Sequence, residues 1–457
     1  MTMGAGFAEI DITPKVFGRL GRLAVEPTQV VGIHLPLLAR LAVFDDGERR
    51  AAILSLDMNL MFSQDVPAIR AAIAEPGGMK PEDIMVACTH THNSFSLMPW
   101  HDDDDLNYKD LDQLCSLMPD LARDAVTRLE TCTFDVGTIQ VEGMTLNRRS
   151  CYGGDDGTVS VGTHGSHDAD NFIGVEGPTD DELKVLLCRT TDGRVLGGIV
   201  NFAAHPISMF GEPVYSSSYI GPLVKTLQAE YGGSFTFLYG FSGNLCPAGN
   251  ATGANANERI GTLLGNKAIE ALANPVRIQG DEIGLSREII PLPFKRVTTE
   301  QIRAAKRYQK MDPADVDPRE MCRALYGHDY IFHSMSAHNV MVFNNEILGM
   351  WEFQRRSGRR NLTHDYEVQV IRVGGLAIAG VSSELFCEVK HELQEASPFA
   401  CTFFASMANG GHGYIPTREG HSHGGLEASL STACQFTEDA CDMVKVSIGR
   451  QLRALRD

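Results

Sequence analysis

Residue types that can bind a metal ion stand directly after several apolar runs of this sequence. Each run has the composition of a buried strand, and strand ends from distant parts of a chain can meet at one edge of a sheet. A site built from such ends would combine imidazole, carboxylate and phenol groups. The residues concerned are, in chain order, His90 with His92, His205, Glu384 and Tyr414.

The His90-Thr91-His92 sequence sets the chemistry that such a site could perform. Side chains alternate between faces in an extended segment, so we expect both imidazoles on one face, one as a ligand and one as an acid–base group. Zinc suits neutral imidazole and carboxylate ligands, and a catalytic site keeps one position open for water. The metal lowers the pKa of that water to about 7 and polarises a carbonyl group. Each residue alone also fits a structural role, and only the combination favours a metal centre.

The elements that would position these residues alternate between strand-like and helix-like patterns, which favours an α/β fold. We expect a mixed β-sheet core flanked by helices, with the metal site at strand ends, in one domain over residues 1–457. Apolar runs predict strands at Ala51–Asp57, Ile84–Thr89, Leu196–Ala203, Phe235–Tyr239, Ala377–Val381 and Phe399–Ser406. Helical periodicity predicts helices at Val66–Ala74, Leu111–Leu129, Gly221–Glu230, Glu258–Leu272, Glu384–Glu395 and Thr437–Leu455. The Gly- and Asp-rich segment Tyr152–Gly177 is expected to be a long loop.

Charge and composition narrow the classes of partner. The 457 residues carry a formal net charge of −18, which disfavours binding to nucleic acid and to anionic membranes. No apolar run approaches the roughly 18 residues that span a bilayer, and no secretory signal is recognisable. The 11 cysteines are scattered without paired spacings, as in reduced compartments. We therefore expect a cytoplasmic protein acting on a small molecule; the sequence leaves open whether it forms a homo-oligomer.

Several motifs follow one another along the chain, beginning with the blocks Gly4–Pro14, Gly32–Arg40 and Thr89–Ser94. Their order resembles the neutral/alkaline ceramidase family: the first two blocks resemble the first blocks of that family, and Thr89–Ser94 is similar to its Thr-His-Thr-His-Ser-Gly signature. The block Asn201–Met209 looks like the one that contains the second histidine ligand. Similar but looser C-terminal blocks are Ala377–Glu384, Asn409–Thr417 and Glu427–Ser429.

This resemblance implies a zinc-dependent amidase on the catalytic domain of that family. By the resemblance one Zn²⁺ is bound by His90, His205, Glu384 and Tyr414, and His92 acts beside the bound water as acid–base group. We expect hydrolysis of an amide bond by a metal-bound water, with an ester or a lactone as the second choice. Tyr414 or His92 would stabilise the oxyanion.

The block Gly243–Ala248 departs from the family pattern Gly-Asp-(Val/Thr)-Ser-Pro-Asn. Asn244 and Cys246 stand where the family has its acid and its serine. We place Asn244 among the substrate-binding residues and Cys246 among the catalytic positions, where its thiol could be a weak donor, a nucleophile or a buried filler; donor or filler is favoured. We expect a catalytic region without the family's C-terminal immunoglobulin-like domain. We also expect a soluble polar substrate rather than a membrane lipid.

Two arginines follow Asn147 at a position similar to an Asn-Arg pair of the family. Arg148 or Arg149 could bind a substrate carboxylate through two hydrogen bonds, or form a structural salt bridge. Two other functions stay open at this point. One is an amidohydrolase-type (β/α)8 barrel, disfavoured because strand-like segments precede His90. The other is a non-catalytic metal- or ligand-binding protein on a ceramidase-like scaffold.

Overall fold

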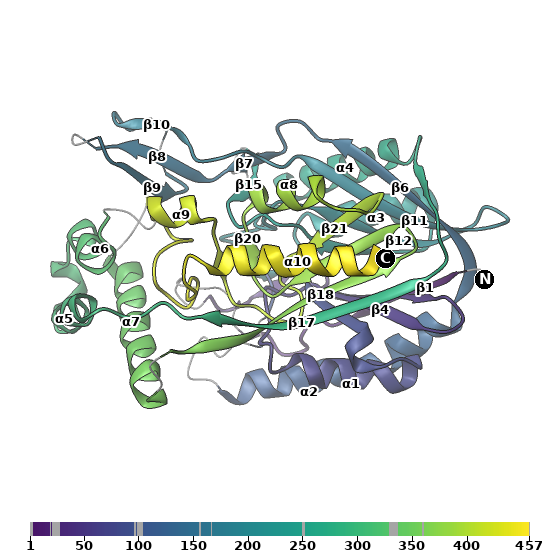
Figure 1. Cartoon of the computed structure of the whole chain (residues 1–457), viewed down its shortest axis with the longest axis horizontal. Helices are drawn as coiled ribbons and strands as arrows, with labels where there is room; N and C mark the ends of the chain where they lie inside the picture. The colour runs from purple at the N-terminus through teal and green to yellow at the C-terminus, as the bar shows by residue number, and fades with distance from the viewer. Residues whose placement is uncertain are drawn as a thin grey trace.

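Two β-sheets lie face to face in the middle of the molecule, and helices cover their outer faces (Figure 1). The computed structural model describes residues 3–18, 20, 28–95, 97, 104–154, 157–165, 167–248, 252–328, 337–358 and 361–456, with the backbone alone for 104–109 and 337–340. The expected α/β class with a mixed sheet flanked by helices is confirmed, and the core consists of two such layers. The prediction of a single domain stays a prediction.

The larger sheet has nine strands and is mixed. Its order is β14-β12-β11-β6-β1-β3-β4-β5, with β16 paired to β6. The pairs β12–β14 and β4–β5 are parallel and the others antiparallel. The strands are β1 (Gly4–Asp11), β3 (Leu38–Asp45), β4 (Arg50–Leu56), β5 (Ile84–Cys88), β6 (Glu130–Gln140), β11 (Glu182–Thr190), β12 (Val195–Phe202), β14 (Ser234–Tyr239) and β16 (Val276–Ile278).

The smaller sheet has four strands and packs on the larger one. Its order is β17 (Ile283–Pro293), β18 (Thr363–Val373), β19 (Leu376–Val381) and β21 (Cys401–Ala405), with β19 and β21 parallel. Apolar side chains of both sheets form the layer between them, for example Phe7 and Ile199 from the larger sheet with Ile371 and Phe403 from the smaller. Burial on both faces explains why most of these strands read as continuous apolar runs.

Helices supply the two outer layers and one end of the molecule. On the larger sheet lie α1 (Val66–Gly77), α2 (Asp104–Thr127), α3 (Ile220–Tyr231) and α4 (Ala254–Ala271). On the smaller sheet lie α8 (Cys387–Glu395) and α10 (Ala440–Arg456). The helices α5 (Thr299–Tyr308), α6 (Pro318–Tyr326) and α7 (Ala337–Ser357) pack on one another at the left end of Figure 1, and α9 (Arg418–His423) is a short helix near them.

The segment predicted to be a long loop contains a small antiparallel sheet, so that prediction is wrong. Its strands β8 (Arg149–Gly153), β9 (Val159–Thr163) and β10 (Phe172–Val175) are ordered β10-β8-β9. They are short and rich in glycine, which hides the alternation that a longer strand would show. Two-residue and three-residue strands complete the fold: β2 (Gly32–Ile33), β7 (Thr145–Asn147), β13 (Val214–Tyr215), β15 (Leu245–Pro247), β20 (Glu384–Leu385) and β22 (Tyr414–Ile415).

The other predicted elements are present with shifted ends, and one shift matters for function. The helix predicted from Glu384 begins at Cys387, because Glu384 belongs to the strand β20. The open sheets are not an eight-stranded barrel, so the amidohydrolase-type alternative is wrong. All 11 cysteines are free. Among the described helices, none has the length and apolar content needed to cross a membrane.

Candidate metal centre

The carboxyl ends of strands from both sheets converge on one place. His90 comes just after β5, His205 comes just after β12, and Tyr239 is the last residue of β14. Glu384 follows β19 of the smaller sheet, and its short strand β20 pairs in parallel with β22, so that Glu384 lies opposite Tyr414. The stacking of the two sheets therefore brings together residues that are up to 324 positions apart, as the numbers of His90 and Tyr414 show (414 − 90).

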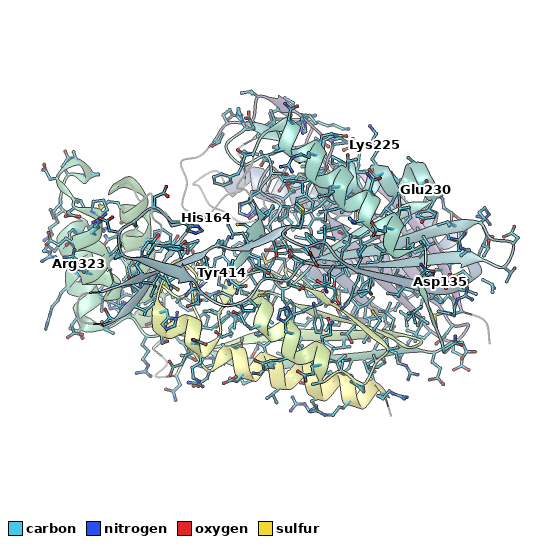
Figure 2. All side chains as sticks on the ribbon, turned by 90° about the horizontal axis from the view of Figure 1, so that it is seen from above. Asp135, His164, Lys225, Glu230, Arg323 and Tyr414 are labelled. Carbon is cyan, nitrogen blue, oxygen red and sulfur yellow. The ribbon has the colours of Figure 1, made fainter. Side chains whose placement is uncertain are left out.

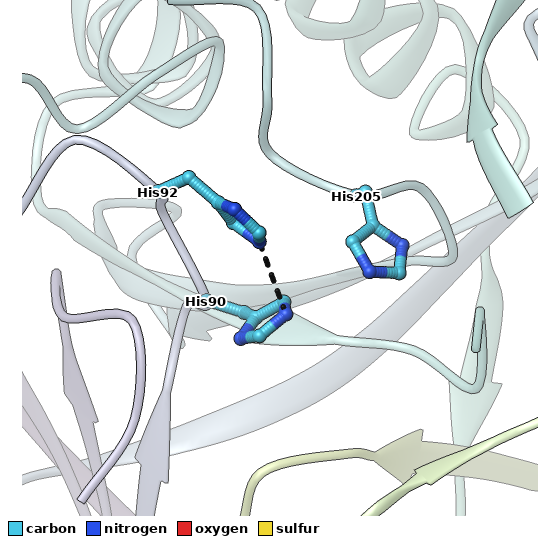
Figure 3. Close-up of side chains that lie close together, drawn as sticks. All are labelled: His90, His92 and His205. Carbon is cyan, nitrogen blue, oxygen red and sulfur yellow. Dashed lines mark hydrogen bonds between the residues drawn. The ribbon is translucent and has the colours of Figure 1, made fainter. Parts of the chain in front are cut away.

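Three imidazoles from two of these strand ends lie together (Figure 3). The Nε2 atoms of His90 and His92 are 3.3 Å apart, and one ring nitrogen from each of His90, His92 and His205 lies within 4.8 Å of the others. His90 and His205 are buried, whereas His92 is half-buried and its ring lies 6.1 Å from that of Phe210. The three residues form a group of the size that one metal ion can bridge.

His90 and His92 lie side by side as expected, but the cause is a turn of the backbone and not the alternation of side chains in a strand. The strand β5 ends at Cys88, and the backbone of His90 has φ 66°, in the left-handed region that non-glycine residues rarely adopt. This turn, not an extended backbone, brings the His90 ring against that of His92. Such conformations cost of order 1–3 kcal/mol and cluster at functional sites.

Backbone carbonyls fix the orientation of the two buried imidazoles. Nδ1 of His90 lies 2.8 Å from the carbonyl oxygen of Asn59, and Nδ1 of His205 lies 2.8 Å from that of Leu245. A carbonyl oxygen only accepts, so each Nδ1 must carry the proton, and each Nε2 presents a lone pair. Metal-binding histidines are held in this way by their second nitrogen. The donor set of the site therefore fits a divalent metal ion.

Glu384 supplies a buried carboxylate between the two imidazoles. Its Oε2 atom lies 2.8 Å from Nε2 of His205 and 3.4 Å from Nε2 of His90. Burial would raise the pKa of Glu384, and charged imidazoles at His90 and His205 would hold it well below its usual value. Burial, followed by the charge of Arg148, lowers the pKa of His205 to about 4, so its imidazole is neutral at pH 7. We rely on the direction for His205, because a neutral imidazole does not lower the pKa of Glu384 by its charge and has a lone pair free to bind a metal.

Tyr239 belongs to this group, although the sequence analysis did not single it out. Its hydroxyl lies 3.1 Å from Oε2 of Glu384 and 2.9 Å from Nδ1 of His205. Its ring stacks on that of His90 at 5.0 Å between centroids. The signal was available, because Tyr239 ends a predicted strand just as the histidines follow theirs. An aromatic residue at the end of an apolar strand also has the composition of the core, so the pattern alone does not mark Tyr239 as part of a site.

Tyr414 lies beside Glu384 under a buried arginine. The Tyr414 ring is buried, and the Arg148 guanidinium carbon lies 5.4 Å from its centroid (Figure 2 shows Tyr414). Burial raises the pKa of Tyr414, the positive charge of Arg148 opposes that rise, and Glu384 adds to it. The role of Tyr414 as a metal ligand stays a prediction.

Arg148 and Arg149 form a buried ionic network. Nε of Arg148 lies 2.9 Å from Glu427, and its Nη2 donates to the carbonyl oxygen of Gly243 at 2.8 Å. Arg149 binds the other oxygen of Glu427 at 2.7 Å and also pairs with Glu176. Of the two interpretations of these arginines, the structural salt bridge is the one observed. Removing one partner of such a buried pair typically costs about 3–5 kcal/mol.

The two unusual residues of the block Gly243–Ala248 occupy structural positions. The Asn244 amide donates to Glu388 at 2.8 Å, and its oxygen accepts from the backbone N–H of Cys387 at 3.0 Å, so both ends are used at the start of α8. The Cys246 thiol is fully buried 3.8 Å from the carbonyl oxygen of Leu146, and burial raises its pKa to about 11. The thiol is therefore protonated at neutral pH, which supports a donor or filler rather than a nucleophile.

Comparison with known proteins identifies the fold. No protein-family model and no curated protein sequence matches the chain. Two solved structures resemble it over 100% of its length. The neutral ceramidase from Pseudomonas aeruginosa gives a TM-score of 0.71 at 17% sequence identity, with 74% of that chain covered. A ceramidase complexed with C2 gives a TM-score of 0.71 at 16% identity, with 75% covered. The chain thus has a ceramidase-like fold along its whole length.

Proposed function

We propose that this protein is a metal-dependent hydrolase that cleaves the carbon–nitrogen bond of an amide. One observation carries the proposal: His90 and His205 each donate Nδ1–H to a backbone carbonyl, so that both Nε2 atoms face the Glu384 carboxylate. The ceramidase-like fold supports the reaction class, because a solved structure of that fold is a neutral ceramidase.

The ion that we propose is Zn²⁺, held by His90, His205, Glu384 and Tyr414. When bound, a divalent metal polarises a carbonyl group and lowers the pKa of a water molecule. His92 stands 3.3 Å from His90 at the more exposed side of the group, where it can take a proton from water and return it to the leaving nitrogen. Tyr239 holds Glu384 and His205 in place, and Arg148 keeps a positive charge beside Tyr414.

The proposed substrate is a small or medium-sized polar amide, with an ester or a lactone as the second choice. The net charge of −18 supports a substrate outside membranes and nucleic acids, and the 11 free cysteines support a cytoplasmic location. Asn244 is directed at Glu388 and Cys387, so we do not include it in the proposed substrate contacts. Arg148 would act on the substrate only indirectly, through Tyr414.

Elemental analysis of the purified protein tests the proposal. The wild type is compared with His90→Ala and Glu384→Ala, and with His391→Ala, whose side chain is 41% exposed, as a matched control. We expect about one zinc per chain in the wild type and the control, and none in the two site variants. Metal-loaded wild type should then hydrolyse a member of a panel of N-acyl compounds.

Two results would contradict the proposal in different ways. Wild type that binds no metal after purification in zinc lacks the proposed centre altogether. Wild type that binds one zinc but cleaves no amide, ester or lactone of the panel would instead favour a non-catalytic metal-binding protein on this fold.

A further inference from the structure

A second cleft lies apart from the metal centre and has a different chemical character. Its volume is about 980 Å³. The strands β8 and β9, the start of α5, the end of α6 and the α9 region line it, and these elements lie at the left of Figure 1. None of His90, His92, His205 or Glu384 is among its lining residues. The volume is in the range of small-molecule sites.

Lys295, in the wall of this cleft, has a charge that no carboxylate neutralises. Its Nζ atom donates to the carbonyl oxygen of Ala428 at 2.7 Å and lies 2.9 Å from the sulfur of Cys434. Within the described part of the chain no acidic side chain lies within 4.0 Å of it. The neighbouring Arg296 hydrogen-bonds to the Asn361 amide oxygen at 3.0 Å and likewise has no acidic partner among the described residues.

The acidic residues of the cleft do not balance these cations. Glu438 and Asp439 line the cleft, but both are bound by Arg418, at 3.3 Å and 2.6 Å. The third acidic neighbour, Glu176, accepts from Nδ1 of His423 at 2.7 Å and pairs with the buried Arg149. Glu438 and Asp439 thus share Arg418, and Glu176 pairs with Arg149 and His423, whereas no salt bridge is formed by Lys295 within the described part of the chain.

The pKa of His421, which also lines the cleft, responds to the charges of the groups around it. Burial is the largest cause that lowers the pKa of His421, to about 3, and the charges of Lys295, Arg149 and Arg418 lower it further. No acidic group contributes in the opposite direction. The wall of the cleft at His421 therefore faces positive charge, in a protein whose net charge is −18.

Two residues of the lining carry hydroxyl groups without hydrogen-bond partners. The Tyr326 hydroxyl and the Thr437 Oγ1 atom lie just below the surface of the cleft and have no partner in the described structure. Leaving a buried hydroxyl unpaired costs roughly 1–3 kcal/mol, and a rotation of the Thr437 side chain toward a ligand would recover it. Further hydroxyls on the lining come from Ser160, Thr298 and Ser422.

From these contacts we propose that the second cleft binds a small polyhydroxylated anion, with its phosphate or carboxylate group on Lys295 and Arg296. A charge-assisted hydrogen bond from each cation would neutralise the ligand's oxyanion. The ligand's hydroxyls would pair with Thr437, once its side chain turns toward the cleft, and with the serine and threonine side chains of the lining. The chemistry is that of a sugar phosphate or a sugar acid. This site is additional to the proposed hydrolase centre and does not depend on it.

Isothermal titration of the full chain with glucose 6-phosphate, inorganic phosphate and glucose tests the proposal. We expect glucose 6-phosphate to bind in the submillimolar range, phosphate more weakly and glucose not at all, because both the charge and the hydroxyls contribute. Lys295→Met should weaken binding of glucose 6-phosphate by at least about tenfold. Lys225→Met, which removes an exposed lysine on α3, should leave binding unchanged.

Two further variants keep the test decisive. Thr437→Val removes an unpartnered hydroxyl without removing a hydrogen bond, so it should fold normally and weaken glucose 6-phosphate by about threefold or more. His90→Ala should retain full binding, which separates the cleft from phosphate bound at the metal centre. Absence of binding in wild type at several millimolar ligand would overturn the proposal. So would unchanged affinity in Lys295→Met, or loss of binding in His90→Ala.

Discussion

The metal centre and the second cleft differ in the polar groups that they direct inwards: acceptors at the metal centre and donors in the cleft. At the metal centre, the acceptor atoms of His90, His205 and Glu384 face one another, and their remaining polar atoms are tied to the backbone or to Tyr239. In the second cleft, the excess is of donors, because Lys295 has neutral partners. Converging acceptors attract a cation, and uncompensated donors attract an anion. The polar groups that line each site therefore indicate the charge of the ligand that the site would bind.

A pair of substitutions, one in each region, tests most strongly whether the two regions bind ligands of opposite charge independently. His205→Ala should remove the metal and lower hydrolysis by about 1000-fold, since a bound metal contributes several kcal/mol to catalysis. The same variant should bind glucose 6-phosphate as the wild type does. Lys295→Met should show the reverse pattern, with full metal content and weakened anion binding.

Metal analysis, activity and calorimetry on the same preparations measure all of these quantities. His391→Ala is the control for the loss of an imidazole, because its side chain is 41% exposed. If either substitution impaired both regions, the two would not be independent sites.

Tyr239→Phe sharpens the account of the metal centre with a smaller effect. The variant keeps the ring that stacks on His90 at 5.0 Å and removes the hydroxyl that lies 3.1 Å from Glu384. Groups that orient metal ligands typically contribute 10–100-fold to metal affinity or activity, so we expect a loss of roughly that size. Competition with a zinc chelator measures the affinity. Tyr219→Phe is the control, because the Tyr219 hydroxyl is also buried but donates to the carbonyl oxygen of Ala204. An unchanged zinc affinity in Tyr239→Phe would exclude the orienting role.

The same difference between the regions explains what the sequence could reveal. His90, His205 and Glu384 each follow an apolar strand, and polar residues at strand ends are visible in a sequence with no alignment. Tyr239 was missed because an aromatic residue that ends an apolar strand looks like core. The convergence itself depends on the stacking of two sheets, which no local pattern encodes.

The second cleft had no such signal. Its walls come from loops, short helices and the strands β8 and β9, whose glycines and short length hide their periodicity. The role of Arg148 was also undecidable from the sequence, because its partner Glu427 lies 279 residues away. Long-range pairing of charges is a property of the tertiary structure, and the sequence offered two equally good interpretations of the arginine.

The pH dependence of stability tests whether burial and the neighbouring cations lower the pKa of His421 in the second cleft. The folded-state pKa of His421 is about 3, below the ordinary value of 6.5. The unfolded chain therefore binds more protons at this residue below pH 6.5, and stability falls on acidification from pH 6.5 towards pH 3. His421→Gln removes this contribution. We expect the free energy of unfolding of the wild type to drop about 1 kcal/mol more than that of the variant between pH 7 and pH 5, allowing for partial exposure.

Urea denaturation at the two pH values measures that difference. His391→Gln is the control, since it removes a more exposed histidine from another part of the surface. Equal slopes of stability against pH in the wild type and in His421→Gln would show that burial and the neighbouring cations together do not lower the pKa of His421.

Cys246→Ser should have the smallest effect on activity, and it tests whether Cys246 takes part in catalysis. The thiol is fully buried, and its pKa of about 11 keeps it protonated at neutral pH. A serine keeps the size and donates a stronger hydrogen bond, so we expect activity within about threefold of the wild type and little change in zinc content. Rapid alkylation by iodoacetamide together with a loss of activity above about 100-fold in Cys246→Ser would indicate a nucleophile instead. The hydrolysis would then proceed through a covalent intermediate, and the metal would not be the group that activates the attacking atom.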